Sequence, residues 1–359
     1  MPPEKNIHRV ILKDKNRNNL KSKIINLYHK LFIPELYRGR TELFTSFLNE
    51  STRLIHLFNF DCIYCSSGPE TTIFIGYEIS KAFNIPWIVD FRDIPEMYKF
   101  THITDIIYKQ NLIRRQNKLL QRAVLIITVS EPFADKLKKR VKKEINLVLN
   151  GFDSHLHKSI AYPSHFEKFN IVYTGQLYSR KDRNPQYLFQ SIDELIIAKK
   201  IDPNKLYIEF YGTEKKEIED LSANYLCKKL IKIHDHCSLF DSLVYQHNAC
   251  ILLFLSVINQ KGIYSTKIFD YLASRRPILS IPDDADVINH ILFENKSGFC
   301  ASTIDEIKNI IFNWYNEWSK NYYIKLNRDE EKIEIFSREC QSNKLVNLIN
   351  EKIDYSIHS

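Results

Sequence analysis

Two successive series of short apolar segments, each alternating with helical patterns, constrain the fold of this chain most. The first series runs over 61–149 and the second over 169–281. Strands separated by helical segments do not form hairpins, so each series predicts a parallel sheet covered by helices. A histidine- and proline-containing segment at 154–167 is interpreted as a linker between them. The chain of 359 residues is therefore predicted to be an α/β protein with two doubly wound domains.

The period of the apolar residues and the content of β-branched residues predict the individual strands and helices. Strands are predicted at 61–65, 87–91, 124–129, 145–149, 171–174, 206–211, 230–233, 250–255 and 277–281. Helices are predicted at 70–83, 104–122 and 131–140, and from an N-cap at Asn184 to about Lys200. The first 58 residues are expected to be polar and helical, and the chain after Thr303 to be helical to its end.

Glycine is scarce, and this excludes two common nucleotide-binding motifs. Only 8 of 359 residues are glycine, no two of them are separated by one residue, and none precedes a lysine. The dinucleotide fingerprint and the P-loop both need such glycines. Any phosphate site must therefore use single glycines, helix N-termini and basic side chains.

The net charge of +8 suits nucleic acid, an anionic membrane or a phosphorylated substrate, without choosing among them. Seven cysteines without a framework spacing favour a reducing compartment. The longest purely apolar run, at 249–255, is much shorter than the ~20 residues of a membrane span. No signal-peptide pattern is present, so we expect a cytoplasmic protein.

Four motifs occur in an order that indicates a family. They are PWIVDFRD at 86–93, TVSE at 128–131 with NGFD at 150–153, YTGQLY at 173–178, and YSTKIFDYLA at 264–273 with RPIL at 276–279. Together they resemble the family 4 glycosyltransferases of the GT-B fold, over about residues 60–346.

The resemblance implies two Rossmann-like domains that face each other across a cleft. We expect an acceptor-side domain at 1–155, a nucleotide-sugar donor domain at 156–325, and C-terminal helices at 326–359 that pack back on the first domain. Family members usually begin with further βα units, so the first domain is expected to be incomplete.

The donor site is expected where a diphosphate leaving group can be stabilised without a metal. Gly175 would allow close backbone approach, and Ser265 and Thr266 would offer the N–H groups of a helix start, with Lys267 beside them. The resemblance places the family's phosphate-binding lysine at Lys181. Arg180 and Arg183 are rivals for that role, and a solvated surface loop is the alternative for the whole segment.

The resemblance also assigns the sugar end of the donor and the acceptor. Asp270 stands where the family has a glutamate that accepts hydrogen bonds from the ribose hydroxyls. Gly262 and Gln176 replace a glutamate and an arginine that are common in the family. Asp93 is predicted to orient or deprotonate the acceptor hydroxyl. Its alternatives are to cap the next helix or to pair with Arg92.

No metal site is predicted. Asp284 and Asp286 form a D-x-D match that is interpreted as a loop with a helix cap. Two further groups of potential zinc ligands are interpreted as non-binding: Cys62 with Cys65, and Cys227, His234, His236 and Cys237. No cofactor is expected, because the nucleotide sugar is a substrate.

The resemblance thus implies a metal-independent, retaining glycosyltransferase. Its partners would be a nucleotide-sugar donor and a lipid-linked or polysaccharide acceptor in surface-glycan synthesis, and not nucleic acid. The alternatives are a non-catalytic scaffold with the GT-B fold and a sugar-nucleotide epimerase of the same fold.

An N-terminal stripe suggests attachment to the inner face of an anionic membrane. Its members are Lys13, Lys15, Arg17, Lys21, Lys23 and Lys30, interleaved with Leu20, Ile24, Leu27 and Leu31. An ordinary helix packed on the sheet has the same pattern and remains the alternative.

Overall fold

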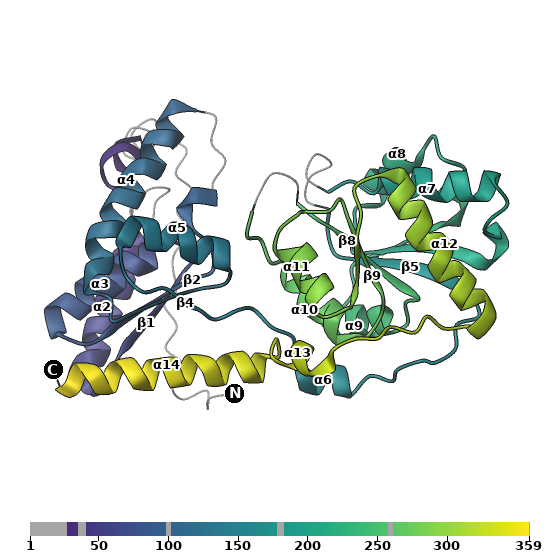
Figure 1. The fold of residues 1–359 in the computed structure, drawn as a ribbon. Coiled ribbons are helices and arrows are strands. Elements are labelled where there is room, and N and C mark those ends of the chain that lie inside the picture. The colour runs from purple at the N-terminus through teal and green to yellow at the C-terminus, as the bar shows by residue number, and fades with distance from the viewer. Residues whose placement is uncertain (1–26, 35–40, 98–101, 178–182, 258–260, 359) are drawn as a thin grey trace. The chain divides into compact units, whose positions relative to one another are not determined.

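A computed structural model describes residues 27–34, 41–97, 102–177, 183–257 and 261–358 (Figure 1). The chain divides into two compact units. The first comprises Met1–Val148 and Lys344–Ser359, and the second comprises Leu149–Asn343. Among the described residues, no helix combines the length and the apolarity that crossing a bilayer requires.

The first unit contains a parallel sheet of four strands. In spatial order these are β1 (Ile63–Ser67), β2 (Trp87–Phe91), β3 (Leu125–Thr128) and β4 (Asn146–Leu147). Its helices are α2 (Thr41–Leu57), α3 (Thr71–Phe83), α4 (Ile103–Leu119), α5 (Glu131–Val141) and the C-terminal part of α14 (Arg338–His358). Every residue of β2 is buried, as expected for a central strand of a parallel sheet.

Side chains of α14 cover one part of the core of this unit. Leu345, Leu348 and Ile349 pack against a cluster formed by Ile88, Leu125, Ile127 and Val148. A separate cluster joins α3 to α4 through Phe74, Tyr108 and Leu112. The end of the chain therefore belongs to the core of the unit in which the chain begins.

The second unit contains a parallel sheet of six strands. Successive strands are first added on one side of β5 and then on the other. The spatial order is β10 (Gly298–Cys300), β9 (Ile278–Ile281), β8 (Ile251–Leu255), β5 (Phe169–Thr174), β6 (Leu206–Tyr211) and β7 (Ile231–His234). The chain leaves β5 toward β6 and β7, and then returns to the other side of β5 with β8. The crevice beyond the carboxyl ends of β5 and β8 is thus a topological switch point.

Helices cover both faces of this sheet (Figure 1). One core gathers alternate residues of β5 and β8 with α7 (Gln186–Ile197), α8 (Lys215–Ser222) and α12 (Ile304–Asn321). The other core contains the intervening strand residues, such as Val172 and Leu252, with α10 (Thr266–Ala273) and α11 (Val287–Glu294). The period of two along a strand produces this division.

The parallel α/β prediction is confirmed, and the bounds of β2 and β6 are those predicted. Three details were wrong. The expected linker contains a helix, α6 (Ser154–Lys158), because the Asp153 side chain accepts the N–H groups of His155 and Leu156. The strand β10 was missed, and the helical C-terminus is interrupted between α12 and α13 (Glu330–Glu334).

Most of the N-terminal stripe lies outside the described residues, which include only Leu27, Lys30 and Leu31 of it. The Lys30 ammonium lies 2.5 Å from the Asp105 carboxylate, and the Leu31 carbonyl accepts a hydrogen bond from Asn111. Both partners belong to α4, so this short segment contacts α4.

Candidate functional site

The carboxyl end of β5 continues into a loop that only glycine accommodates easily. Gly175 has a φ of +107°, and its N–H donates to the Tyr211 carbonyl at 2.7 Å. The Thr213 hydroxyl donates to the Gly175 carbonyl at 2.8 Å. These two bonds connect the end of β5 to the end of β6 and fix the loop at the switch point.

Lys267 aims its ammonium group at this loop. A Cβ placed on Gly175 would lie 3.0 Å from Lys267 Nζ, which also lies 3.9 Å from the centre of the Tyr173 ring. Within the described residues, no hydrogen bond or ion pair of Nζ is found. Burial, together with the positive charge of Arg183, lowers the pKa of Lys267 well below its ordinary value. In its protonated form, Lys267 is therefore a cation with no counter-ion among the described residues, and it lies beside a residue that has no side chain.

The start of α10 brings further donors to the same place. Ser265 precedes the helix, and its hydroxyl does not cap it, while Thr266 is the first helical residue. The first N–H groups of a helix have no partner inside it. In α10 the N–H of Ile268 donates to the Ser265 carbonyl, which leaves the N–H groups of Thr266 and Lys267 for a ligand. A small hollow beside them has four polar residues in its lining: Arg183, Ser265, Ser256, which follows β8, and the acidic Asp284. These donors and cations suit a bound anion.

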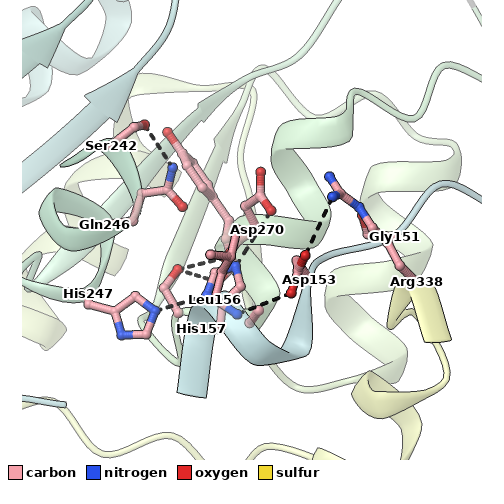
Figure 2. A network of polar contacts seen from close by, with 12 residues as sticks. Gly151, Asp153, Leu156, His157, Ser242, Gln246, His247, Asp270 and Arg338 are labelled. Carbon is pink, nitrogen blue, oxygen red and sulfur yellow. Dashed lines mark hydrogen bonds and ion pairs between the residues drawn. The ribbon is translucent and has the colours of Figure 1, made fainter. Parts of the chain in front are cut away.

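Asp270 lies one turn further along α10. Its carboxylate is 21% exposed, and one oxygen lies 3.5 Å from Nε2 of the buried His157 (Figure 2). The structure thus brings Gly175, Ser265, Thr266, Lys267 and Asp270 together within one unit. Arg180 and Lys181 lie outside the described residues.

Comparison with known proteins supports a fold assignment. No family model matches the chain, and no curated protein matches it in sequence. A solved structure of Anabaena HepE in complex with UDP is similar, with a TM-score of 0.63, 16% identity, and coverage of 85% of this chain and 82% of that one. A glycosyltransferase from Rickettsia africae has a TM-score of 0.62 at 14% identity, and 96% of this chain and 84% of that chain are covered. The chain has the GT-B fold.

The same GT-B fold also occurs in a putative UDP-N-acetylglucosamine 2-epimerase from Listeria monocytogenes. That structure has a TM-score of 0.55 at 9% identity, and 89% of this chain and 82% of that chain are covered. Likeness at these identities assigns the GT-B fold, and the chemistry has to be argued from the residues.

In the first unit of this GT-B protein, the DFRD motif divides into a buried and an exposed part. Asp90 is 2% exposed, and it accepts hydrogen bonds from Tyr64 at 2.5 Å and from Arg92 at 2.7 Å. Burial and the neighbouring Asp90 raise the pKa of Tyr64 to about 12. Asp93 is exposed, two residues beyond the end of β2. Arg92 thus pairs with the buried Asp90.

In the D-x-D sequence of this GT-B protein, the Asp284 carboxylate caps the helix α11. The Asp284 carboxylate accepts the backbone N–H groups of Asp286, Ile288 and Asn289 at the start of α11. The interpretation as a helix cap is therefore confirmed. In the part of the chain that the structure describes, no group of three potential metal ligands occurs.

Several buried polar residues in the second unit of this GT-B protein were not anticipated. The Thr174 N–H donates to the Tyr271 hydroxyl at 3.1 Å, and Gln246 donates to the Thr174 hydroxyl at the same distance. His157 and His247 form a buried pair behind Asp270. These partners are far apart in sequence and share no motif, so no sequence signal could have joined them.

Proposed function

We propose that this protein is a glycosyltransferase that uses a nucleotide-sugar donor. The observation that carries the proposal is the ammonium group of Lys267, which lies beside Gly175 at the switch point without an anionic partner among the described residues. A nucleoside diphosphate supplies the missing charge. The GT-B fold, shared with a protein solved in complex with UDP, supports UDP as the diphosphate to test first.

The proposed mechanism stabilises the departing diphosphate electrostatically. As the bond to the sugar breaks, negative charge grows on the diphosphate. Lys267 and the first N–H groups of α10 would interact with it more strongly in the transition state than in the ground state. Because their positions are fixed before the reaction, little reorganisation is needed. Lys181 and Arg180 are proposed to add positive charge, and Asp270 to bind the ribose hydroxyls.

The acceptor is proposed to be a lipid-linked or polysaccharide intermediate of a surface glycan. Asp93 would orient or deprotonate its hydroxyl, and transfer would proceed with retention and without a metal. Replacing Asp93 with Asn should lower kcat and leave the dissociation constant for UDP unchanged, since Asp93 is not proposed to touch the donor. A weakened UDP affinity in Asp93→Asn would contradict this assignment.

Calorimetric titration with UDP tests the donor site. Lys267→Met keeps the side-chain volume over the Tyr173 ring but removes the charge. We expect it to weaken UDP binding by about 1–3 kcal/mol, the range for a charge-assisted hydrogen bond. Lys216→Ala, at an exposed position on α8, removes the same charge elsewhere and should bind like the wild type. Equal affinity in Lys267→Met and wild type would show that the donor site is elsewhere.

Two other functions remain to be separated from transfer. The likeness to a putative epimerase makes interconversion of free UDP-sugars the second candidate. An epimerase changes the configuration of UDP-N-acetylglucosamine without any acceptor, whereas a transferase releases UDP, slowly by hydrolysis or rapidly with acceptor. A scaffold would bind UDP but produce neither result. Product analysis of one incubation with labelled UDP-sugar distinguishes the three.

A further inference from the structure

Two buried histidines form a polar pair behind the helix that carries Asp270. His157 on α6 is 2% exposed, and His247 at the end of α9 (Leu239–His247) is completely buried. His157 Nδ1 and His247 Nε2 lie 2.9 Å apart, and the two rings are stacked (Figure 2). Core packing alone does not require two imidazoles here, since an apolar pair would avoid burying four ring nitrogens.

The groups around the two rings indicate which ring nitrogens carry hydrogens. A separation of 2.9 Å needs one donor and one acceptor, so at least one of the two rings is neutral. Burial lowers the pKa of His247 to about 3, with contributions from His157 and Arg276, so His247 is the neutral ring. The other nitrogen of His157, Nε2, lies 3.5 Å from an Asp270 oxygen. Nε2 has no hydrogen-bond partner among the described residues, so its contact with the Asp270 carboxylate is electrostatic. If His247 donates to His157 Nδ1, a neutral His157 carries its hydrogen on Nε2, on the side of that carboxylate.

The carboxylate of Asp270 is held from one side only. Apart from His157, no described side chain makes a hydrogen bond or ion pair with it, and the hydrogen bonds from Ser274 go to the Asp270 backbone carbonyl. One carboxylate oxygen faces His157, and the group remains 21% exposed. The Asp270 carboxylate is thus contacted by His157 on its buried side, and its other side is accessible to a ligand.

The helix that carries His157 is itself held in place. Asp153 caps α6, and the Arg338 guanidinium lies 3.9 Å from the Asp153 carboxylate (Figure 2). Arg338 Nε also donates to the Gly151 carbonyl at 3.1 Å. The ring of Phe152 meets that of His157 edge to face. These contacts fix the position from which His157 reaches Asp270.

We propose that His157 is a positioning residue, which orients the Asp270 carboxylate to receive the ribose hydroxyls of the donor. The proposal rests on the proposed function, in which Asp270 binds that ribose. An aspartate on a helix surface samples several rotamers, and ordering it on binding costs free energy. A polar contact with a buried, fixed imidazole lowers this cost before the ligand arrives, in the way that outer partners orient the ligands of other sites.

Paired ligands and paired variants test the proposal. The ligands are UDP and 2′,3′-dideoxy-UDP, which lacks the hydroxyls that Asp270 would bind. His157→Phe keeps the aromatic packing but cannot donate to Asp270, whereas the amide of His157→Gln occupies the region of Nε2 and can. We expect His157→Phe to weaken UDP binding by about tenfold, because the Asp270 carboxylate loses its one polar contact among the described side chains, and His157→Gln to restore most of it. Binding of the dideoxy ligand should be the same in all three proteins.

Testing His157→Phe in the Asp270→Asn variant distinguishes a positioning role of His157 from a purely structural one. In Asp270→Asn, changing His157 to Phe should cause no further loss of UDP affinity, because the carboxylate on which it acts is absent. If His157→Phe does not fold, His157→Asn replaces it, since its shorter amide reaches His247 but not Asp270.

Three results would overturn the proposal, and they are distinguishable. If UDP binds and Asp270→Asn weakens it, but His157→Phe binds normally, the positioning role alone is wrong. If His157→Phe weakens both ligands equally, His157 supports the fold and not the carboxylate. If the wild type does not bind UDP, or binds both ligands equally, the donor assignment of Asp270 is wrong and the proposal fails with it.

Discussion

The buried His247 should make the second unit lose stability as the pH falls. In the native protein its pKa is lowered to about 3, whereas an unfolded histidine has its ordinary value of 6.5. Between these values the unfolded chain binds a proton that the native state does not. The free energy of unfolding therefore decreases as the pH is lowered, by about 1.4 kcal/mol for each pH unit below 6.5. At pH 5 the accumulated loss from this one group is about 2 kcal/mol.

His247→Gln isolates this contribution. The glutamine amide can still donate to His157, but it cannot take up a proton. Urea unfolding between about pH 7 and pH 5 should show a fall in stability about 2 kcal/mol smaller in His247→Gln than in wild type. Two of the three tryptophans, Trp314 and Trp318, lie in the same unit as His247, so fluorescence follows its unfolding.

An exposed histidine provides the control. His290 on α11 lies in the same unit and is exposed, so His290→Gln should follow the wild-type pH profile. Parallel profiles for wild type and His247→Gln would refute the reasoning, because they would mean that His247 takes up its proton equally in both states.

Three further predictions concern the donor site and the sheet. The pKa of Lys267 is lowered, and UDP should raise it, so binding should take up protons at pH values between the free and the bound pKa. The uptake is measured as a dependence of the calorimetric enthalpy on the buffer's ionisation enthalpy, and it should disappear in Lys267→Met. UDP affinity should be unchanged by EDTA, and a loss restored by manganese would contradict the metal-independent mechanism. A Cβ on Gly298 would lie 1.9 Å from the Ile278 carbonyl, so Gly298→Ala should destabilise the protein by about 2 kcal/mol or more in urea unfolding, and a change below about 0.5 kcal/mol would contradict this clash.

Much of the fold could be predicted because the buried parallel strands are mostly apolar, with a single carboxylate in each of β2 and β6. Strands β2 and β6 have the predicted bounds, since β-branched and aromatic residues fill them and polar turns end them. Strand β10 has only three residues and includes Gly298, which no propensity rule favours in a strand. Its place depends on the close approach of the neighbouring strand, which is a tertiary effect.

Some residues of the candidate site could likewise be predicted from the sequence, and others could not. Gly175 and Lys267 could be anticipated, because a lone glycine after one strand and a lysine at a helix start are local signals. That they meet at the switch point depends on strand order, which the sequence leaves open. The support of Asp270 by His157 could not be anticipated. His157 lies in a segment with the composition of a linker, and its partner His247 is 90 residues away.

The two edges of the six-stranded sheet bear on how this protein behaves at high concentration. Both edge strands are short, with three residues in β10 and four in β7. Strand β7 also carries the exposed Lys232, whose ammonium lies 3.5 Å from the centre of the Tyr207 ring on the neighbouring strand. A short edge offers few free backbone groups, and a lysine there opposes pairing with a second chain. The six-stranded sheet is therefore protected against edge-to-edge aggregation, even though parallel sheets form slowly and expose their strands during folding.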